Sequence, residues 1–304
     1  MLPRLPVHTA QLPEAGTLNL DHIAHFVPDR EAAADALARL GFTTTPFSEQ
    51  SHRTRPDAPV EPAGTGNRCV MLERGYLEFL TPFADTPIAA QLRVAIGRYT
   101  GVHLIAYGSA DAQADHHRLE AEGFAPPDPV RLQREVDTGE GTMTVRFTVT
   151  RTAPGCMPEG RIQFCQHHSP EGVWQTRWLA HPNALRELRA VHLCVSDPEE
   201  AAQRYARYAG IPLQPLPAGR GRGYVQQTAR GRLVVCDAAR LDDLLGIEPP
   251  ALPWIGAAEL ASADPARTAT VLRDGGYVPV PLQDGRARVD LPDALGGVLV
   301  LARD

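Results

Sequence analysis

The most constraining feature of this sequence is a pattern that occurs four times along its 304 residues. In each copy an aspartate follows a short apolar stretch, and a glycine stands twelve or thirteen positions later, after an alanine-rich segment. The four pairs are Asp29 and Gly41, Asp111 and Gly123, Asp197 and Gly210, and Asp264 and Gly276. A repeat of this length indicates one supersecondary unit that is used four times.

Each copy reads as a strand, a helix and two or three further strands. Segment 30–40 has the apolar spacing of an amphipathic helix, Asp29 stands at its N-cap, and Gly41 stands where a left-handed C-cap belongs. Tight glycine turns join the last strands, at Arg74-Gly75, Glu159-Gly160, Arg230-Gly231 and Gly296-Gly297. We therefore predict an α+β fold of four βαβββ units, with helices at about 30–40, 112–122, 198–209 and 265–275.

Four such units in one chain resemble the vicinal oxygen chelate superfamily, and the first half resembles its glyoxalase-like domain group. The resemblance covers about residues 18–304 and includes three short motifs, namely Asp21-His22, Gly64-Thr65-Gly66-Asn67 and Gly75-Tyr76-Leu77-Glu78. The superfamily includes glyoxalase I, extradiol dioxygenases, methylmalonyl-CoA epimerase and bleomycin- and fosfomycin-resistance proteins. It implies a fold more strongly than a reaction, because one fold hosts many functions.

The four units divide the chain into an expected pair of domains. We predict an N-terminal arm at 1–17, a first domain of two units at 18–168, and a second domain of two units at 188–304. Between them, the crossover linker 169–187 contains Trp174, Trp178 and a proline, which favour an ordered segment. In this superfamily, two units curl into a half-open barrel, so the resemblance implies two half-barrels.

Composition and charge narrow the classes of partner. A net charge of −6 argues against nucleic acid or an anionic membrane surface as the main partner. No segment reaches the ~20 apolar residues of a membrane span, and five cysteines without a CxxC pair are typical of a reducing compartment. We expect a cytoplasmic protein with a small-molecule substrate, and a homodimer is left open as its assembly.

The resemblance implies a metal site in the first half, because the superfamily takes metal ligands from the first and last strands of each unit. The matching positions are His22 and Glu78 in the first unit, and His103 and Gln163 in the second. His22, Glu78 and His103 are the predicted ligands. Two imidazoles and one carboxylate suit non-haem Fe, while Mn, Zn, Co and Ni are also compatible.

Other polar residues surround this predicted site. Gln163, Cys165 and His167 share one face of their strand by alternation, and Gln163 and His167 are the candidate catalytic residues. His167 is either a general acid–base or an exposed strand-end histidine. Gln166 lies on the opposite face and is a candidate substrate contact. His52, in the long loop 45–68, is either a surface side chain or a residue that closes over the pocket.

The second half has no matching ligands. The positions that correspond to the predicted ligands hold Ala190, Val234, Ala257 and Val300, none of which binds metal. His192 and Glu259 lie one step further along the strands, on the same face. We expect this half to have a degenerate site.

Two functional hypotheses remain. The first is a metal-dependent enzyme, with lyase, isomerase and dioxygenase outcomes open, whose small oxygenated substrate chelates a divalent ion. The second is a metal-free binding or resistance protein that uses the same cavity. The motifs of serine hydrolases, P-loop proteins and zinc proteases are absent from the sequence.

Overall fold

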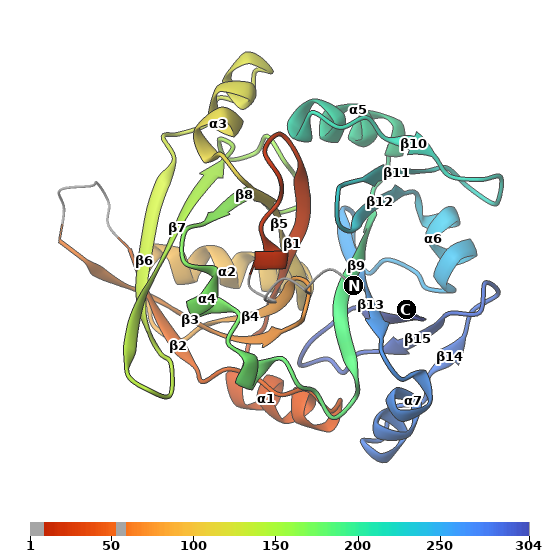
Figure 1. The fold of residues 1–304 in the computed structure, drawn as a ribbon. Coiled ribbons are helices and arrows are strands. Elements are labelled where there is room, and N and C mark those ends of the chain that lie inside the picture. The colour runs from red at the N-terminus through yellow and green to blue at the C-terminus, as the bar shows by residue number, and fades with distance from the viewer. Residues whose placement is uncertain (1–8, 53–58, 304) are drawn as a thin grey trace, which may run out of the picture.

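A computed structural model describes residues 9–52 and 59–303, and it contains the four predicted βαβββ units (Figure 1). The first unit is β1 (Leu18–Phe26), α1 (Arg30–Arg39), β2 (Ser48–His52), β3 (Glu61–Met71) and β4 (Tyr76–Pro82). The second is β5 (Gly101–Ser109), α3 (Ala112–Ala121), β6 (Val130–Asp137), β7 (Thr142–Arg151) and β8 (Arg161–His167).

The third and fourth units repeat the same order. The third is β9 (Leu185–Cys194), α5 (Pro198–Ala209), β10 (Gln214–Pro215), β11 (Gly223–Gln227) and β12 (Arg232–Cys236). The fourth is β13 (Trp254–Ser262), α7 (Pro265–Asp274), β14 (Val280–Pro281), β15 (Ala287–Asp290) and β16 (Val298–Arg303). The predicted fold and its four helices are confirmed.

Local capping explains why the units begin and end their helices where the repeat predicts. The side chains of Asp29, Asp111, Asp197 and Asp264 each accept hydrogen bonds from backbone N–H groups in the first turn of the following helix. Gly41, Gly123, Gly210 and Gly276 all have positive φ angles. An L side chain is disfavoured in that region, so glycine ends each helix at low cost.

The strands pair in one curved sheet, and the same pairing pattern occurs in both halves of the chain. β1 pairs antiparallel with β5 in the first half, and β9 pairs antiparallel with β13 in the second. Each of these four strands also pairs in parallel with the last strand of its own unit. The two halves join where Ile255 of β13 pairs with Val102 of β5, so they lie side by side (Figure 1).

Two further helices, not predicted from the sequence, cover the inner faces of the halves. α2 (Pro87–Arg98) packs Leu92 against Ala24, Phe26 and Leu104 in the first half. α6 (Ala238–Leu245) packs Leu241 and Leu245 with Val300 in the second half. Val300, which stands at a position that matches a predicted ligand of the first half, is thus buried beside α6. Among the helices of the described residues, none has the length and apolar character needed to cross a bilayer.

The linker also covers part of the first inner face. It contains α4 (Pro170–Val173) and the 3-10 turn η2 (Thr176–Trp178), and a similar turn, η1 (Thr9–Gln11), lies in the N-terminal arm. Trp174 packs with Cys69, Met71 and Val145 and meets the ring of His167 edge-on at 4.8 Å. The inner face of the first half thus lies between α2 at one end and Trp174 at the other.

Candidate metal centre

Strand register places three of the predicted site residues on the inner face of the first half. His22 of β1 pairs with Ala106 of β5, and Ala106 pairs with Gln163 of β8. Ala24, two residues after His22, pairs with Glu78 of β4. Since side chains alternate along a strand, His22, Ala24 and Phe26 face the same side as the α2 contact. Glu78 in the first unit and Gln163 in the second unit therefore occupy equivalent positions.

A β-bulge brings a further acidic residue to this face. The pairing of β1 with β5 moves from Leu20 opposite Tyr107 to His22 opposite Ala106, so Asp21 is an extra residue in the ladder. A bulge re-aims the side chain that it contains. Across from it, Gly108 leaves room, since an added Cβ would lie 3.4 Å from Oδ1 of Asp21.

Asp21, His167 and Cys165 form a compact cluster. Oδ2 of Asp21 lies 3.0 Å from Nε2 of His167, and Sγ of Cys165 lies 3.6 Å from the same nitrogen. Within residues 9–52 and 59–303, this is the one group of three potential metal-binding side chains whose donor atoms all lie within 4.8 Å of one another. Oδ1 of Asp21 and Nδ1 of His167 are buried and have no hydrogen-bond partner in the described part of the chain.

The cluster is strongly polarised. Burial raises the pKa of the Asp21 carboxyl, but His167 and His22 beside it bring that pKa below its ordinary value. Burial lowers the pKa of His167, but Cys165 and Asp21 raise it to about 10. Asp21 and His167 therefore form a buried ion pair in the absence of any cation.

His22 is held in an orientation that leaves one ring nitrogen available. Its Nδ1 lies 2.7 Å from Oδ2 of Asp21, and its ring stacks on Tyr76 with centroids 4.3 Å apart. The contact with Asp21 assigns the proton to Nδ1, and no hydrogen bond to Nε2 occurs among the described residues. The lone pair of Nε2 is therefore free for a proton or a cation.

Glu78 shows a similar division of its two ends. One carboxylate oxygen accepts a hydrogen bond from the side-chain amide of Asn67, in the neighbouring strand β3. The other oxygen has no hydrogen-bond partner in the described part of the chain. Glu78 is 8% exposed, so this free oxygen lies at the edge of the buried region rather than in open solvent.

The structure does not bring His103 to the other predicted ligands. Nε2 of His103 donates to the carbonyl of Tyr99 at 2.8 Å, and the two rings stack at 4.1 Å. A second bulge explains the difference, because His103 is the extra residue between Leu104 opposite Ala24 and Val102 opposite His25. His103 is thus the counterpart of Asp21, and Leu104 is the counterpart of His22.

The other predicted site residues have different surroundings. Oε1 of Gln163 accepts from Nε of Arg151 at 3.1 Å on the inner face. Gln166 lies on the opposite face, where it donates to the carbonyl of Ala110 and accepts from the N–H of Ala112. It therefore fixes the start of α3 and does not reach the inner face. The side chain of His52 lies outside the described residues.

Sequence reasoning missed Asp21 and Cys165 as functional candidates. Simple alternation puts Asp21 on the face opposite His22, and a bulge cannot be read from a strand pattern. The structure shows a positional regularity that links these bulges, since all four first strands have a register shift at the residue eight before the helix-capping aspartate. Those residues are Asp21, His103, Arg189 and Gly256.

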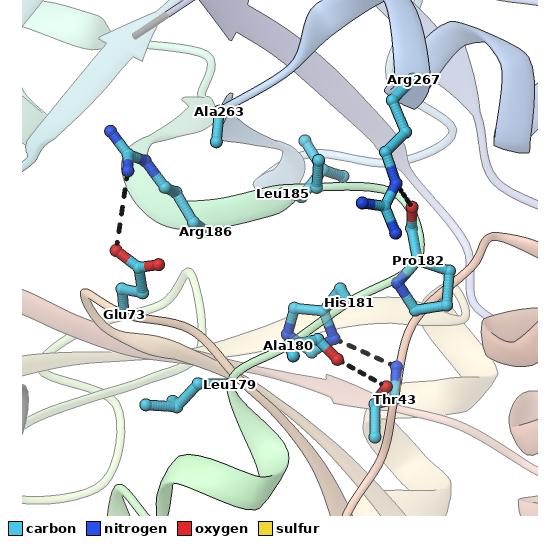
Figure 2. Close-up of a pocket in the computed structure, with 11 residues that line it drawn as sticks. Thr43, Glu73, Leu179, Ala180, His181, Pro182, Leu185, Arg186, Ala263 and Arg267 are labelled. Carbon is cyan, nitrogen blue, oxygen red and sulfur yellow. Dashed lines mark hydrogen bonds and ion pairs between the residues drawn. The ribbon is translucent and has the colours of Figure 1, made fainter.

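A separate cavity of ≈450 Å³ lies along the linker, beside α7 and the end of α1 (Figure 2). His181 accepts from the N–H of Thr43 and donates to the carbonyl of Met71, and Arg267 donates to the carbonyl of Pro182. None of its lining residues has an unpartnered buried polar atom within the described chain. We interpret this cavity as a packing gap between the linker and the neighbouring elements rather than as the active site.

Comparisons with known proteins are consistent with the repeat. A family model described as "Glyoxalase-like domain" matches residues 20–209. No curated protein matches the sequence.

Solved structures resemble the whole chain at low sequence identity. A hypothetical protein from Staphylococcus aureus has a TM-score of 0.58 at 11% identity, over 94% of this chain and 100% of that chain. A mutant 4-hydroxymandelate synthase from Streptomyces coelicolor has a TM-score of 0.52 at 13% identity, over 94% of this chain and 92% of that chain. The Mn(II)-bound glyoxalase from Novosphingobium aromaticivorans has a TM-score of 0.51 at 10% identity, over 95% of this chain and 82% of that chain. At these identities the likeness concerns the fold alone.

Proposed function

The chain belongs to the glyoxalase-like domain family, and we propose that it is a metal-dependent enzyme whose active site is the inner face of its first half. Its substrate is a small oxygenated molecule. The observation that carries the proposal is the convergence of Asp21, Cys165 and His167 on one point. The Mn(II)-bound glyoxalase and the hydroxymandelate synthase share the fold and support this reading at the level of the superfamily.

The donor set fits a divalent cation. A tetrahedral ion with typical ligand distances separates neighbouring N, O and S donors by about 3.3–3.6 Å. The Nε2–Oδ2 separation of 3.0 Å and the Nε2–Sγ separation of 3.6 Å lie within a few tenths of an ångström of this range, and all three donor atoms lie within 4.8 Å of one another. Oδ1 of Asp21 offers a further lone pair that has no other partner. A mixed N, O and S set suits Zn, Co or Fe better than Mg or Ca.

Two other residues of this face have the properties of acid–base groups. Asp21 holds the proton of His22 on Nδ1, so Nε2 is able to accept a proton from a bound substrate. Glu78 offers its free carboxylate oxygen in the same way, while Asn67 fixes the other oxygen. When bound, a divalent cation supplies Lewis acidity, which stabilises negative charge on a substrate oxygen. Loss of a proton and stabilisation of the resulting anion are common to lyase, isomerase and dioxygenase chemistry.

Metal analysis tests the proposal. Protein purified without chelator should retain about one divalent ion per chain by elemental analysis, and Cys165→Ser and His167→Ala should lose it. His103→Ala should retain the ion, because His103 lies in the other bulge. A wild-type protein that binds no ion when Zn, Fe, Mn, Co or Ni is supplied would contradict the proposal.

One observation favours a second candidate, a metal-free binding protein. Asp21 and His167 are already an ion pair, so the cluster has a compensated charge without a cation. In that case the same face binds a small molecule without converting it. The elemental analysis distinguishes the two functions directly.

A further inference from the structure

Two arginines on the inner face of the first half lack an acidic partner. Arg151 of β7 lies opposite Gln163 of β8, and Arg161 lies two residues before Gln163, so both arginines share its face. Within residues 9–52 and 59–303, neither guanidinium makes an ion pair. Arg204 and Arg286, by contrast, are half-buried and are paired with Glu159 and Glu259.

Neutral contacts hold both guanidinium groups in place. Nε of Arg151 donates to Oε1 of Gln163 at 3.1 Å, which leaves its two terminal nitrogens free as a fork. A terminal nitrogen of Arg161 donates to Oε1 of Gln91 at 3.4 Å, and its guanidinium lies 5.5 Å from the ring centroid of Phe26. A positioned fork of this kind matches the two oxygens of a carboxylate.

The surroundings concentrate positive charge. Burial and the nearby charge of Arg151 lower the pKa of Arg161 to about 10, although Glu78 opposes both effects. The pKa of Arg151 is also lowered by burial, although its side chain is exposed.

We infer that Arg151 and Arg161 bind a carboxylate of the substrate, which makes that substrate a small carboxylic acid. Two arginines and one glutamate give this part of the face a net charge of one positive unit, which matches a carboxylate better than a doubly charged phosphate. The inference rests on the proposed function for its link to catalysis, and the anion site itself is testable without metal. Gln163 is a positioning residue here, because it acts through Arg151.

Binding of simple anions to metal-free protein tests this site. Acetate and benzoate, measured by calorimetry at low salt, should bind at least about tenfold more tightly than acetamide and benzamide, given the strength of charged hydrogen bonds. Arg151→Met and Arg161→Met should each weaken benzoate by about tenfold or more. The benzoate affinity of Arg151→Lys should fall between those of the wild type and Arg151→Met, since lysine keeps the charge and loses the fork.

Arg146→Met is the matched control. Arg146 belongs to the same strand β7 but is exposed on the opposite face, so benzoate affinity should not change. Thermal melting of each variant reports folding, and Arg151→Lys keeps the test valid if Arg151→Met is unstable. Equal affinities of benzoate and benzamide for the wild type, or a tighter affinity for inorganic phosphate, would overturn the inference.

Elemental analysis of the same samples before metal removal separates this result from the proposed function. Retained metal without benzoate binding overturns the carboxylate site and leaves the metal centre standing. Benzoate binding that depends on Arg151, in a protein that never holds metal, supports the carboxylate site and contradicts the metal-dependent enzyme.

Discussion

Asp21 and His167 are 146 residues apart in the sequence, yet Oδ2 of the first lies 3.0 Å from Nε2 of the second. The contact depends on the bulge in β1, which turns Asp21 toward the inner face. His22 donates to the same carboxylate oxygen at 2.7 Å. One carboxylate therefore orients two histidines that come from the two units of the first half.

Asp21→Asn should destabilise the fold. The change removes the carboxylate that pairs with the buried imidazolium of His167, and loss of one partner of a buried ion pair costs about 3 kcal/mol. Urea denaturation of metal-free protein near neutral pH measures this free energy. Asp29→Asn is a suitable control, because asparagine also caps a helix and the stability should change little. Equal stabilities for the two variants would contradict the role given to the Asp21–His167 pair.

Glu78→Gln should tighten the binding of benzoate to metal-free protein. The glutamate carries a negative charge that opposes both Arg151 and Arg161, and the amide keeps a hydrogen-bond acceptor for Asn67. A charge at this range changes affinity by about threefold. Calorimetry at low salt measures the change, and weaker binding in Glu78→Gln would show that the glutamate contacts the ligand directly.

Stability should fall at acidic pH because of Glu259 in the second half. Burial raises the pKa of Glu259, but His192, Arg232 and Arg286 together lower it from 4.5 to about 2. A folded-state pKa below the unfolded value stabilises the protein above about pH 4.5, and this contribution disappears as the pH falls toward 2.

The contribution of Glu259 is at most about 3 kcal/mol. Glu259→Gln should lower stability at neutral pH and flatten the stability curve between pH 4.5 and 2. Denaturation curves across this range test the prediction, with the exposed Glu199→Gln as control. A variant whose pH dependence equals that of the wild type would contradict it.

Leu92→Ala should destabilise the protein by about 3 kcal/mol, because it removes a fully buried side chain where α2 covers the inner face. Val94→Ala, on the same helix, should have little effect, since Val94 is 74% exposed. Thermal and urea unfolding compare the two variants. Similar losses in both would contradict the role given to core packing, since alanine favours a helix more than leucine or valine does.

The repeat predicted the fold because capping aspartates, C-cap glycines and apolar spacing are local signals that recur in each unit. α2 and α6 were missed, since only the first and third units have a helix of eight or more residues after their last strand, and the second unit has only the short α4 there. Glu78 and Gln163 were placed correctly relative to each other by counting from the turn glycine.

Counting back from the helix-capping aspartate failed for His103. His22 precedes its aspartate by seven residues and His103 by eight, and this one-residue difference places His103 at the bulge rather than at the ligand position. The role of Asp21 could not be predicted for the same reason. Long-range contacts such as Asp21 with His167 follow from strand register, which the sequence does not state.

Cobalt substitution tests the central claim most directly. Metal-free wild-type protein titrated with Co(II) should develop the intense near-ultraviolet band of a sulfur-to-cobalt charge transfer, together with visible bands typical of four-coordinate cobalt. Cys165→Ser should lose the near-ultraviolet band, while Glu78→Gln and His103→Ala should keep it. A wild-type spectrum without that band, or one that Cys165→Ser leaves unchanged while Glu78→Gln abolishes metal binding, would contradict a centre built from Asp21, Cys165 and His167.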